Sequence, residues 1–150
     1  MVTDTQEHSL KTFIQSPSRN HLIFSNGCID GLVYVDVGLE ISTYIEDKVG
    51  DRRLSMRTQD IINIKLKDSI RTSETFGSYL AITNIGIIFE PALKIDIEGL
   101  LNRWSQNVCL FVNIEKGIID NNSLFLVKGC PIDYSVSLEA INYYEFNKTT

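Results

Sequence analysis

The sequence has only three cysteines and no long hydrophobic run. Cys28, Cys109 and Cys130 lie far apart and are not paired with histidines at ligand spacing, so they indicate neither a disulfide framework nor a zinc site. No apolar run approaches the roughly 20 residues that cross a bilayer. Residues 1–12 are polar and lack the apolar segment of a signal peptide. We therefore expect a cytoplasmic protein with no metal and no membrane partner.

Basic residues are also in short supply. The chain has 14 Lys and Arg against 19 Asp and Glu, a net charge of −5, and phosphate backbones repel such a chain unless a local basic patch exists. The basic cluster of Arg52, Arg53 and Arg57, with Lys65 and Lys67 beyond it, is more simply a solvated helix face and its preceding loop. We expect no direct contact with nucleic acid.

The sequence lacks the residue combinations of common hydrolases. His8 lies near the amino terminus and His21 in an expected short helix, so no Ser-His-Asp or Cys-His arrangement is readable. Asp96 and Glu98 are two residues apart on an expected helix and cannot converge on one substrate. We therefore predict no catalytic residue.

What is present is the composition of one globular domain spanning residues 1–150. Of these residues 43% are hydrophobic, and a chain of this length buries about two-thirds of its unfolded surface without a staple. We expect the polar ends, 1–9 and 147–150, to fray.

Short hydrophobic runs alternate with stretches of helical periodicity. The runs predict strands at residues 12–15, 32–36, 79–83, 108–113 and 141–146, with a short extra strand at 124–127. Apolar stripes predict helices within residues 37–45, 56–71 and 97–104. This alternation predicts an α/β three-layer sandwich with a mostly parallel five-stranded sheet.

Three segments resemble one known family. Asn84–Lys94 is similar to an Asn-Ile-Glu triplet followed by a Phe-Asp-Pro-x-Leu-Lys turn in BrxF, a small P-loop protein of type-three bacteriophage-exclusion (BREX) systems. Tyr34–Glu40 resembles the family's strand-to-helix segment, and Leu100–Asn107 resembles its Leu-Leu-x-x-Leu-Ser-Arg-Asn helix end. The segments follow the family's order within residues 13–146. The resemblance implies a P-loop NTPase-like fold in a prokaryotic antiviral defence system.

The resemblance places the phosphate-binding loop at residues 13–20, between the first strand and a short helix at His21–Ser25. A working P-loop needs two glycines, a lysine and a magnesium-binding hydroxyl. Here both glycines are absent, Arg19 takes the lysine's position and Asn20 takes the hydroxyl's. The planar arginine fork cannot replace a compact ammonium group in a tight loop.

Ser16 and Ser18 complete this degenerate nucleotide site under the resemblance. An ordinary alternative exists for the same residues. Ser16-Pro17-Ser18 before a helix is also a common turn and helix cap that needs no ligand.

The resemblance also implies a second half of the site. The expected strand 79–82 ends at Thr83, where a P-loop enzyme has the aspartate that orients Mg²⁺, and Gly86 stands where the family has a glutamate. Glu90 resembles the aspartate of the family's turn and is expected to cap that turn. Asn113 follows the fourth strand, where related enzymes sense the γ-phosphate, although an Asn there is also an ordinary turn former.

These substitutions predict a non-hydrolysing P-loop-like protein, a pseudo-ATPase without a cofactor. It would act as a subunit or adaptor that binds other proteins of the defence system, with self-association as an alternative. Trp104, the Arg52-Arg53-Arg57 cluster and the Tyr143-Tyr144 pair are residue types that anchor interfaces. The simpler reading is that Trp104 and one tyrosine belong to the core.

Two other functions fit the sequence. One is a divergent ATPase or ATP-binding protein that uses Arg19 in place of the lysine and takes Mg-ATP as its cofactor. The other is a small α/β binding module without nucleotide ancestry. This last hypothesis predicts that residues 15–20 do not lie between a central strand and a helix.

Overall fold

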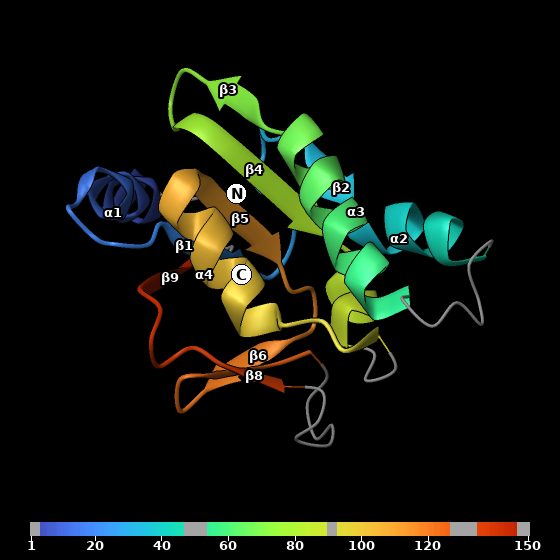
Figure 1. Ribbon diagram of the computed structural model, residues 1–150. Helices are drawn as coiled ribbons and strands as arrows, with labels where there is room; N and C mark the ends of the chain where they lie inside the picture. Colours follow the sequence, from blue (N-terminus) through green and yellow to red (C-terminus); the bar gives the residue numbers. More distant parts are fainter. Residues whose placement is uncertain (1–3, 47–53, 90–92, 127–134, 147–150) are drawn as a thin grey trace.

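A mostly parallel β-sheet forms the centre of the structure (Figure 1). The computed structural model describes residues 4–46, 54–89, 93–126 and 135–146. Along the chain these form α1 (Asp4–Gln15), β1 (Leu22–Ser25), β2 (Tyr34–Asp36), α2 (Val37–Glu46), α3 (Leu54–Asp68), β3 (Arg71–Ser73), β4 (Gly77–Thr83), the 3₁₀ helix η1 (Ile85–Phe89), α4 (Ile97–Asn107), β5 (Cys109–Asn113), β6 (Ile118–Asp120), β7 (Ser123–Phe125), β8 (Ser135–Ser137) and β9 (Tyr143–Phe146).

The strand order of the main sheet is β2-β4-β5-β1-β9, and these five strands are parallel. The sixth strand, β3, pairs with the amino-terminal half of β4 in the antiparallel sense. Every residue of β1 and β5 is buried, as expected for central strands that are covered on both faces. Strands β6, β7 and β8 form a separate antiparallel sheet after the carboxyl end of β5.

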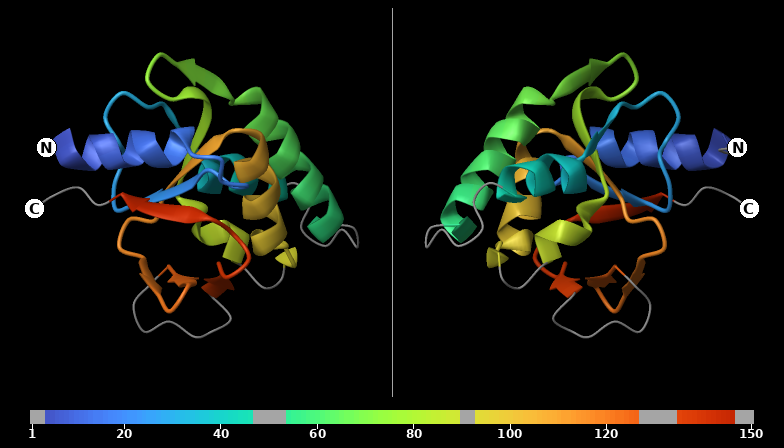
Figure 2. Two further views of the ribbon diagram at one scale, coloured as in Figure 1. Left: turned by 90° about the vertical axis from the view of Figure 1, so that its left-hand side faces the viewer. Right: turned by 90° about the vertical axis from the view of Figure 1, so that its right-hand side faces the viewer.

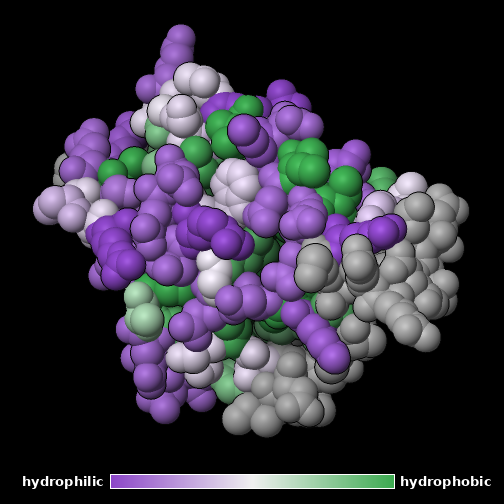
Figure 3. Space-filling model, viewed as in Figure 1, coloured by the Kyte–Doolittle hydropathy of each residue, from purple (hydrophilic) through white to green (hydrophobic). Residues whose placement is uncertain are grey.

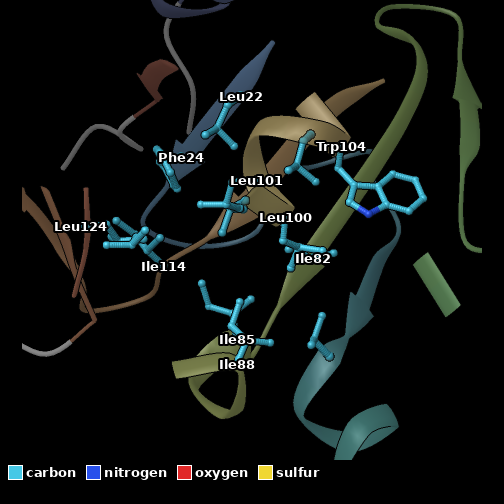
Figure 4. Packing of buried hydrophobic residues seen from close by; sticks show 14 of the residues in the cluster. Leu22, Phe24, Ile82, Ile85, Ile88, Leu100, Leu101, Trp104, Ile114 and Leu124 are labelled. Carbon is cyan, nitrogen blue, oxygen red and sulfur yellow. The ribbon is translucent and has the colours of Figure 1, made fainter. Parts of the chain in front are cut away.

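Helices and loops cover both faces of the main sheet, so the fold has three layers. On one face α2, α3, α4, η1 and the small sheet share a large cluster of buried apolar residues. Figure 4 shows Leu101 of α4 in this cluster with Phe24 of β1 and Ile82 of β4. The other face is covered by α1 and by the loop between β1 and β2, which contribute Leu10 and Ile29 to a second cluster. Figure 2 shows α1 and the pair α3 and α4 on opposite sides of the strands.

The α/β class, the parallel sheet and the three layers agree with the sequence-based prediction. The helices α2, α3 and α4 and the strands β4 and β5 occur within a few residues of their predicted positions. The strand count was wrong, because β3 forms an exposed polar hairpin with β4 where we expected the end of a helix. The extra strand predicted at 124–127 corresponds to β7, which belongs to the small sheet.

The prediction for the start of the chain was also wrong. Residues 12–15 are not a strand but the end of α1, because Leu10, Phe13 and Ile14 have i, i+3, i+4 spacing and together face the second cluster. The segment His21–Ser25, expected to be helical, contains β1, an interior strand between β5 and β9. Its short apolar run, followed by Gly27, is typical of a fully buried strand.

Candidate functional site

Topology indicates where a ligand site would lie. In open parallel sheets, ligands bind beyond the carboxyl ends of two neighbouring strands whose connections leave in opposite directions. Strands β1 and β5 are such neighbours. The connection from β1 to β2 adds Ile29 to the second cluster, whereas the connection from β5 to β9 adds Leu124 and Val136 to the first. The expected site is therefore at Ser25 and Asn113, the carboxyl ends of β1 and β5.

The side chain of Asn113 is the centre of a hydrogen-bond network at this point. Its Oδ1 accepts from the backbone N–H of Gly27 at 2.8 Å and of Glu115 at 2.9 Å. Its Nδ2 donates to Thr83 Oγ1 at 3.0 Å and to Cys28 Sγ at 3.5 Å. A carboxamide has two acceptor and two donor positions. All four are used within the protein, and Asn113 is only 5% exposed.

The carboxyl ends of β2 and β4 are joined by a second set of hydrogen bonds. Asp36 caps α2, because its Oδ1 accepts from the backbone N–H of Leu39 at 2.9 Å. The same oxygen accepts from Asn84 Nδ2 at 2.8 Å. These two bonds, the backbone one first, lower the pKa of Asp36 below the ordinary value of 3.8. The acidic side chain at this edge therefore serves as a helix cap.

A cavity of about 550 Å³ opens beside this network. It is lined by residues that follow β4, by the last residue of β5 and those after it, and by one residue after β7: Asn84, Ile85, Gly86, Asn113, Ile114, Glu115, Lys116 and Leu126. Its walls are mixed, with apolar side chains next to one carboxylate and one ammonium group, both exposed to solvent. No group of three or more His, Cys, Asp and Glu side chains suited to a metal ion occurs in the described part of the chain.

The predicted site residues fall at opposite edges of the sheet. Thr83 and Asn113 meet at the carboxyl edge, as described above. Ser16, Ser18 and Arg19 precede β1 and lie at its amino end. The four residues of β1 separate the two groups by roughly 13 Å, at about 3.3 Å per residue. They therefore do not form one site.

Asn20 precedes β1 and forms hydrogen bonds with α4. It is fully buried, and its Nδ2 donates to the backbone and side-chain oxygens of Asn102 and to Ser105 Oγ at 2.9–3.1 Å. Its Oδ1 accepts from the backbone N–H of Asn142 at 3.4 Å. Ser16 and Ser18 share a hydrogen bond of 2.8 Å in the turn before β1. The turn predicted at Ser16-Pro17-Ser18 is present, but it leads into a strand and not into a helix.

Residues 26–33, which follow β1, were not predicted from the sequence to be part of the site. Gly27 and Gly31 have positive φ angles of 131° and 89°, and the tyrosine hydroxyls of Tyr34 and Tyr79 accept from the backbone N–H groups of the segment. Burial raises the pKa of Tyr34. Between Ser25 and Tyr34, which the structure describes throughout, the chain forms no helix. An Asn-Gly pair directly after an apolar run was the available signal of a strand end.

The predicted interface residues have mixed positions. Trp104 is 9% exposed and donates from Nε1 to Asn63 Oδ1 at 3.0 Å, so it belongs to the core, as does Cys109. Tyr143 and Tyr144 are half-buried, and their rings contact other aromatic rings. Arg57 is exposed. Arg52, Arg53, Glu90 and Cys130 lie outside the described residues.

Among the described residues, the exposed apolar side chains come from several parts of the chain. The large ones above about one-third exposure are Val33, Leu39, Ile64, Ile70 and Ile118, which come from five different segments. On the face shown in Figure 3, hydrophilic side chains dominate and apolar ones occur in small groups. The described residues on that face therefore show no extended apolar patch of the kind that marks an obligate interface.

Comparison with known proteins gives no family assignment. The chain matches no family model, no curated protein and no solved structure. Among the described residues, no helix has both the length and the apolar character needed to cross a membrane.

Proposed function

We propose that this chain is a non-hydrolysing, P-loop-like cytoplasmic protein that acts as a subunit or adaptor by binding another protein. A BREX-like antiviral system is the setting that its sequence resemblance suggests. The observation that carries the proposal is the Asn113 network. At the point of the sheet where a ligand site is expected, the polar groups satisfy one another.

The strand order supports a P-loop-like frame. In chain order the parallel strands are β1, β2, β4, β5 and β9, so the first strand lies between the fourth and the fifth. The order changes direction between β1 and β5, and nucleotide-binding doubly wound sheets hold their ligand at such a point. Thr83 and Asn113 end the third and fourth strands and are in contact, as the resemblance would have it for the metal and phosphate-sensing positions.

The residues at this edge do not fit Mg-ATP. A P-loop binds phosphate with the backbone N–H groups at the start of a helix that follows the first strand, and residues 26–33 form no such helix. This segment also contains no lysine. The backbone N–H of Gly27 is already bonded to Asn113. Since losing one charge-stabilising group often costs a factor of about 10²–10³ in rate, losing all of them favours a role without hydrolysis.

Arg19 gives no support to the divergent ATPase. It lies before β1 at the amino edge, whereas Thr83 and Asn113 lie at the carboxyl edge. One bound phosphate cannot contact both the amino ends and the carboxyl ends of the strands in one sheet. Residues 15–20 also connect the end of α1 to β1, so the helix comes before the strand. In a P-loop the strand comes first and the helix follows. The hypothesis of a small α/β binding module without nucleotide ancestry predicts this arrangement of residues 15–20. That hypothesis and our proposal both assign the chain a role in binding another protein.

The proposal puts the partner contact at the cavity beside Asn113. The test is to co-express the tagged chain with the proteins encoded by neighbouring genes and to measure complex formation with and without Mg-ATP. Gly86→Trp adds a ring at a residue that lines the cavity, and a Cβ at position 86 meets no atom within 4 Å. Ser78→Trp adds the same ring at the exposed amino end of β4 and serves as the matched control.

We expect a stoichiometric complex that forms without nucleotide, survives Ser78→Trp and is lost in Gly86→Trp. Absence of any complex with these partners would contradict the adaptor role. Equal binding by the two tryptophan variants would move the contact away from the cavity. ATP turnover by the purified chain would contradict the non-hydrolysing role.

A further inference from the structure

The sequence contains one Asn-Gly pair, Asn26-Gly27, and in the structure it directly follows the carboxyl end of β1. Asn26 is exposed to solvent. In such a pair the backbone nitrogen of glycine can attack the side-chain carbonyl carbon of asparagine, because glycine has no side chain to hinder the approach. The pair is therefore chemically able to deamidate.

The backbone nitrogen of Gly27 and the side chain of Asn26 are both hydrogen-bonded to the segment 113–117. The backbone N–H of Gly27 donates to Asn113 Oδ1 at 2.8 Å. The side-chain Nδ2 of Asn26 donates to the backbone oxygens of Glu115 at 2.9 Å and Gly117 at 3.1 Å. Attack requires the Gly27 nitrogen to lose its proton, which breaks its hydrogen bond to Asn113. It also requires the Gly27 nitrogen and the Asn26 side chain to turn toward each other, which breaks the hydrogen bonds from Asn26 to Glu115 and Gly117.

We propose that Asn26-Gly27 is a latent deamidation site and that Asn113 suppresses the reaction in the folded protein. In the reaction, a bond forms between the Gly27 nitrogen and Asn26 Cγ, and the bond from Cγ to Nδ2 breaks. The Gly27 nitrogen gives up its proton and the side-chain nitrogen leaves as ammonia. Water then opens the cyclic imide to aspartate or isoaspartate at position 26.

The modification would change the edge of the candidate site. An aspartate at position 26 has no N–H to donate, and its carboxylate would face the carbonyl oxygens of Glu115 and Gly117. The two hydrogen bonds from the side chain of residue 26 to the segment after β5 would be lost. Because no step of the reaction reverses spontaneously to asparagine, the loosening accumulates with the age of the protein.

The experiment compares two substitutions at one position. Asn113→Ala removes the acceptor of the Gly27 N–H, whereas Asn113→Asp keeps an acceptor oxygen and removes only the donors to Thr83 and Cys28. Each protein is incubated at mildly alkaline pH, and the peptide that contains residue 26 is followed by mass spectrometry. The wild-type chain unfolded in urea gives the unprotected rate.

We expect the folded wild type to deamidate at least about tenfold more slowly than the unfolded chain, because the reaction requires local opening. Asn113→Asp should remain slow, and folded Asn113→Ala should be several-fold faster than wild type. Equal rates in folded and unfolded wild type would overturn the proposal, as would a folded Asn113→Ala that is as slow as wild type. If Asn113→Ala fails to fold, a fast rate in folded Asn113→Asp would overturn it equally.

Discussion

Asn84 donates from its side-chain nitrogen to the carboxylate of Asp36 at 2.8 Å, although the two residues are 48 positions apart in the sequence. The bond joins the carboxyl ends of β4 and β2, which are paired up to Asp36 and Thr83. Asn84 has a positive φ of 55°, a conformation that asparagine tolerates better than most residues. At this edge of the sheet, polar side chains thus hydrogen-bond to one another and to the protein's own backbone.

The carboxylate of Asp36 should make stability depend on pH. Its pKa in the folded protein is lowered, first by the backbone N–H of Leu39 and then by Asn84. A group with a lowered folded pKa stabilises the protein above the unfolded value, here 3.8, and this contribution is lost as the pH falls through the folded pKa. Urea unfolding should show Asp36→Asn less stable than wild type near neutral pH, with the difference shrinking below pH 3.8.

Asp30→Asn is the control for that comparison, because it removes the same charge from the neighbouring exposed loop. A difference between wild type and Asp36→Asn that stays constant from neutral to acid pH would contradict the role of the carboxylate.

Gly38 should not tolerate a side chain while Asn84 is present. A Cβ at position 38 would clash with the side-chain amide of Asn84. Alanine is otherwise better than glycine in a helix by about 0.8–1 kcal/mol. We expect Gly38→Ala to lower the free energy of unfolding by about 1–2 kcal/mol in the wild type. In an Asn84→Gly background the same change should cost less, because only the backbone oxygen of residue 84, 3.0 Å from such a Cβ, remains close. A double-mutant cycle in urea measures the difference. Equal costs in both backgrounds would be inconsistent with the clash.

Asn20 should act through stability alone. Replacing it by leucine leaves the buried hydroxyl of Ser105 and the half-buried oxygens of Asn102 without the amide donor, at a cost of about 2–3 kcal/mol in the free energy of unfolding. Its neighbour Arg19 is exposed, and Arg19→Ala should change stability by about 0.5 kcal/mol or less. Chemical denaturation of the two variants tests this contrast. Similar effects from both would argue against the buried network.

Thr58 offers a stabilising substitution. It is fully buried, and its hydroxyl is the one buried side-chain group in the described part of the chain without a hydrogen-bond partner. A buried unsatisfied hydroxyl costs about 1–3 kcal/mol. Thr58→Val keeps the shape and removes the hydroxyl, so we expect a higher midpoint of thermal unfolding. A lower midpoint would show that the hydroxyl is bonded in solution.

The elements with one clear period could be predicted from the sequence. α4 has apolar residues at helical spacing after the capping residue Asp96, whose side chain accepts from the backbone N–H of Gly99. Strands β4 and β5 are near-continuous apolar runs. Phe13 and Ile14, in contrast, fit either a short strand or a helix stripe. Their place in α1 is decided by packing with Leu10 against the second face of the sheet, which is a tertiary effect.

The candidate site could be predicted in part for the same reason. Thr83 and Asn113 follow predicted strands, and parallel pairing of β4 with β5 brings them together. The contribution of Gly27 could not be predicted, because its strand was assigned as a helix. The role of Asn20 depends on α4, more than 80 residues away in the sequence, so no local pattern reveals it.

The central claim is that the polar groups at the carboxyl edge of this sheet are hydrogen-bonded within the protein and do not bind a nucleoside triphosphate. The most direct test is titration of the purified chain with Mg-ATP, followed by calorimetry and by thermal unfolding. A ligand at one hundred times its Kd would add about 2.7 kcal/mol to the free energy of unfolding. We predict no saturable heat and an unchanged midpoint at millimolar Mg-ATP. Saturable binding that raises the midpoint and is weakened by Asn113→Ala would contradict the claim.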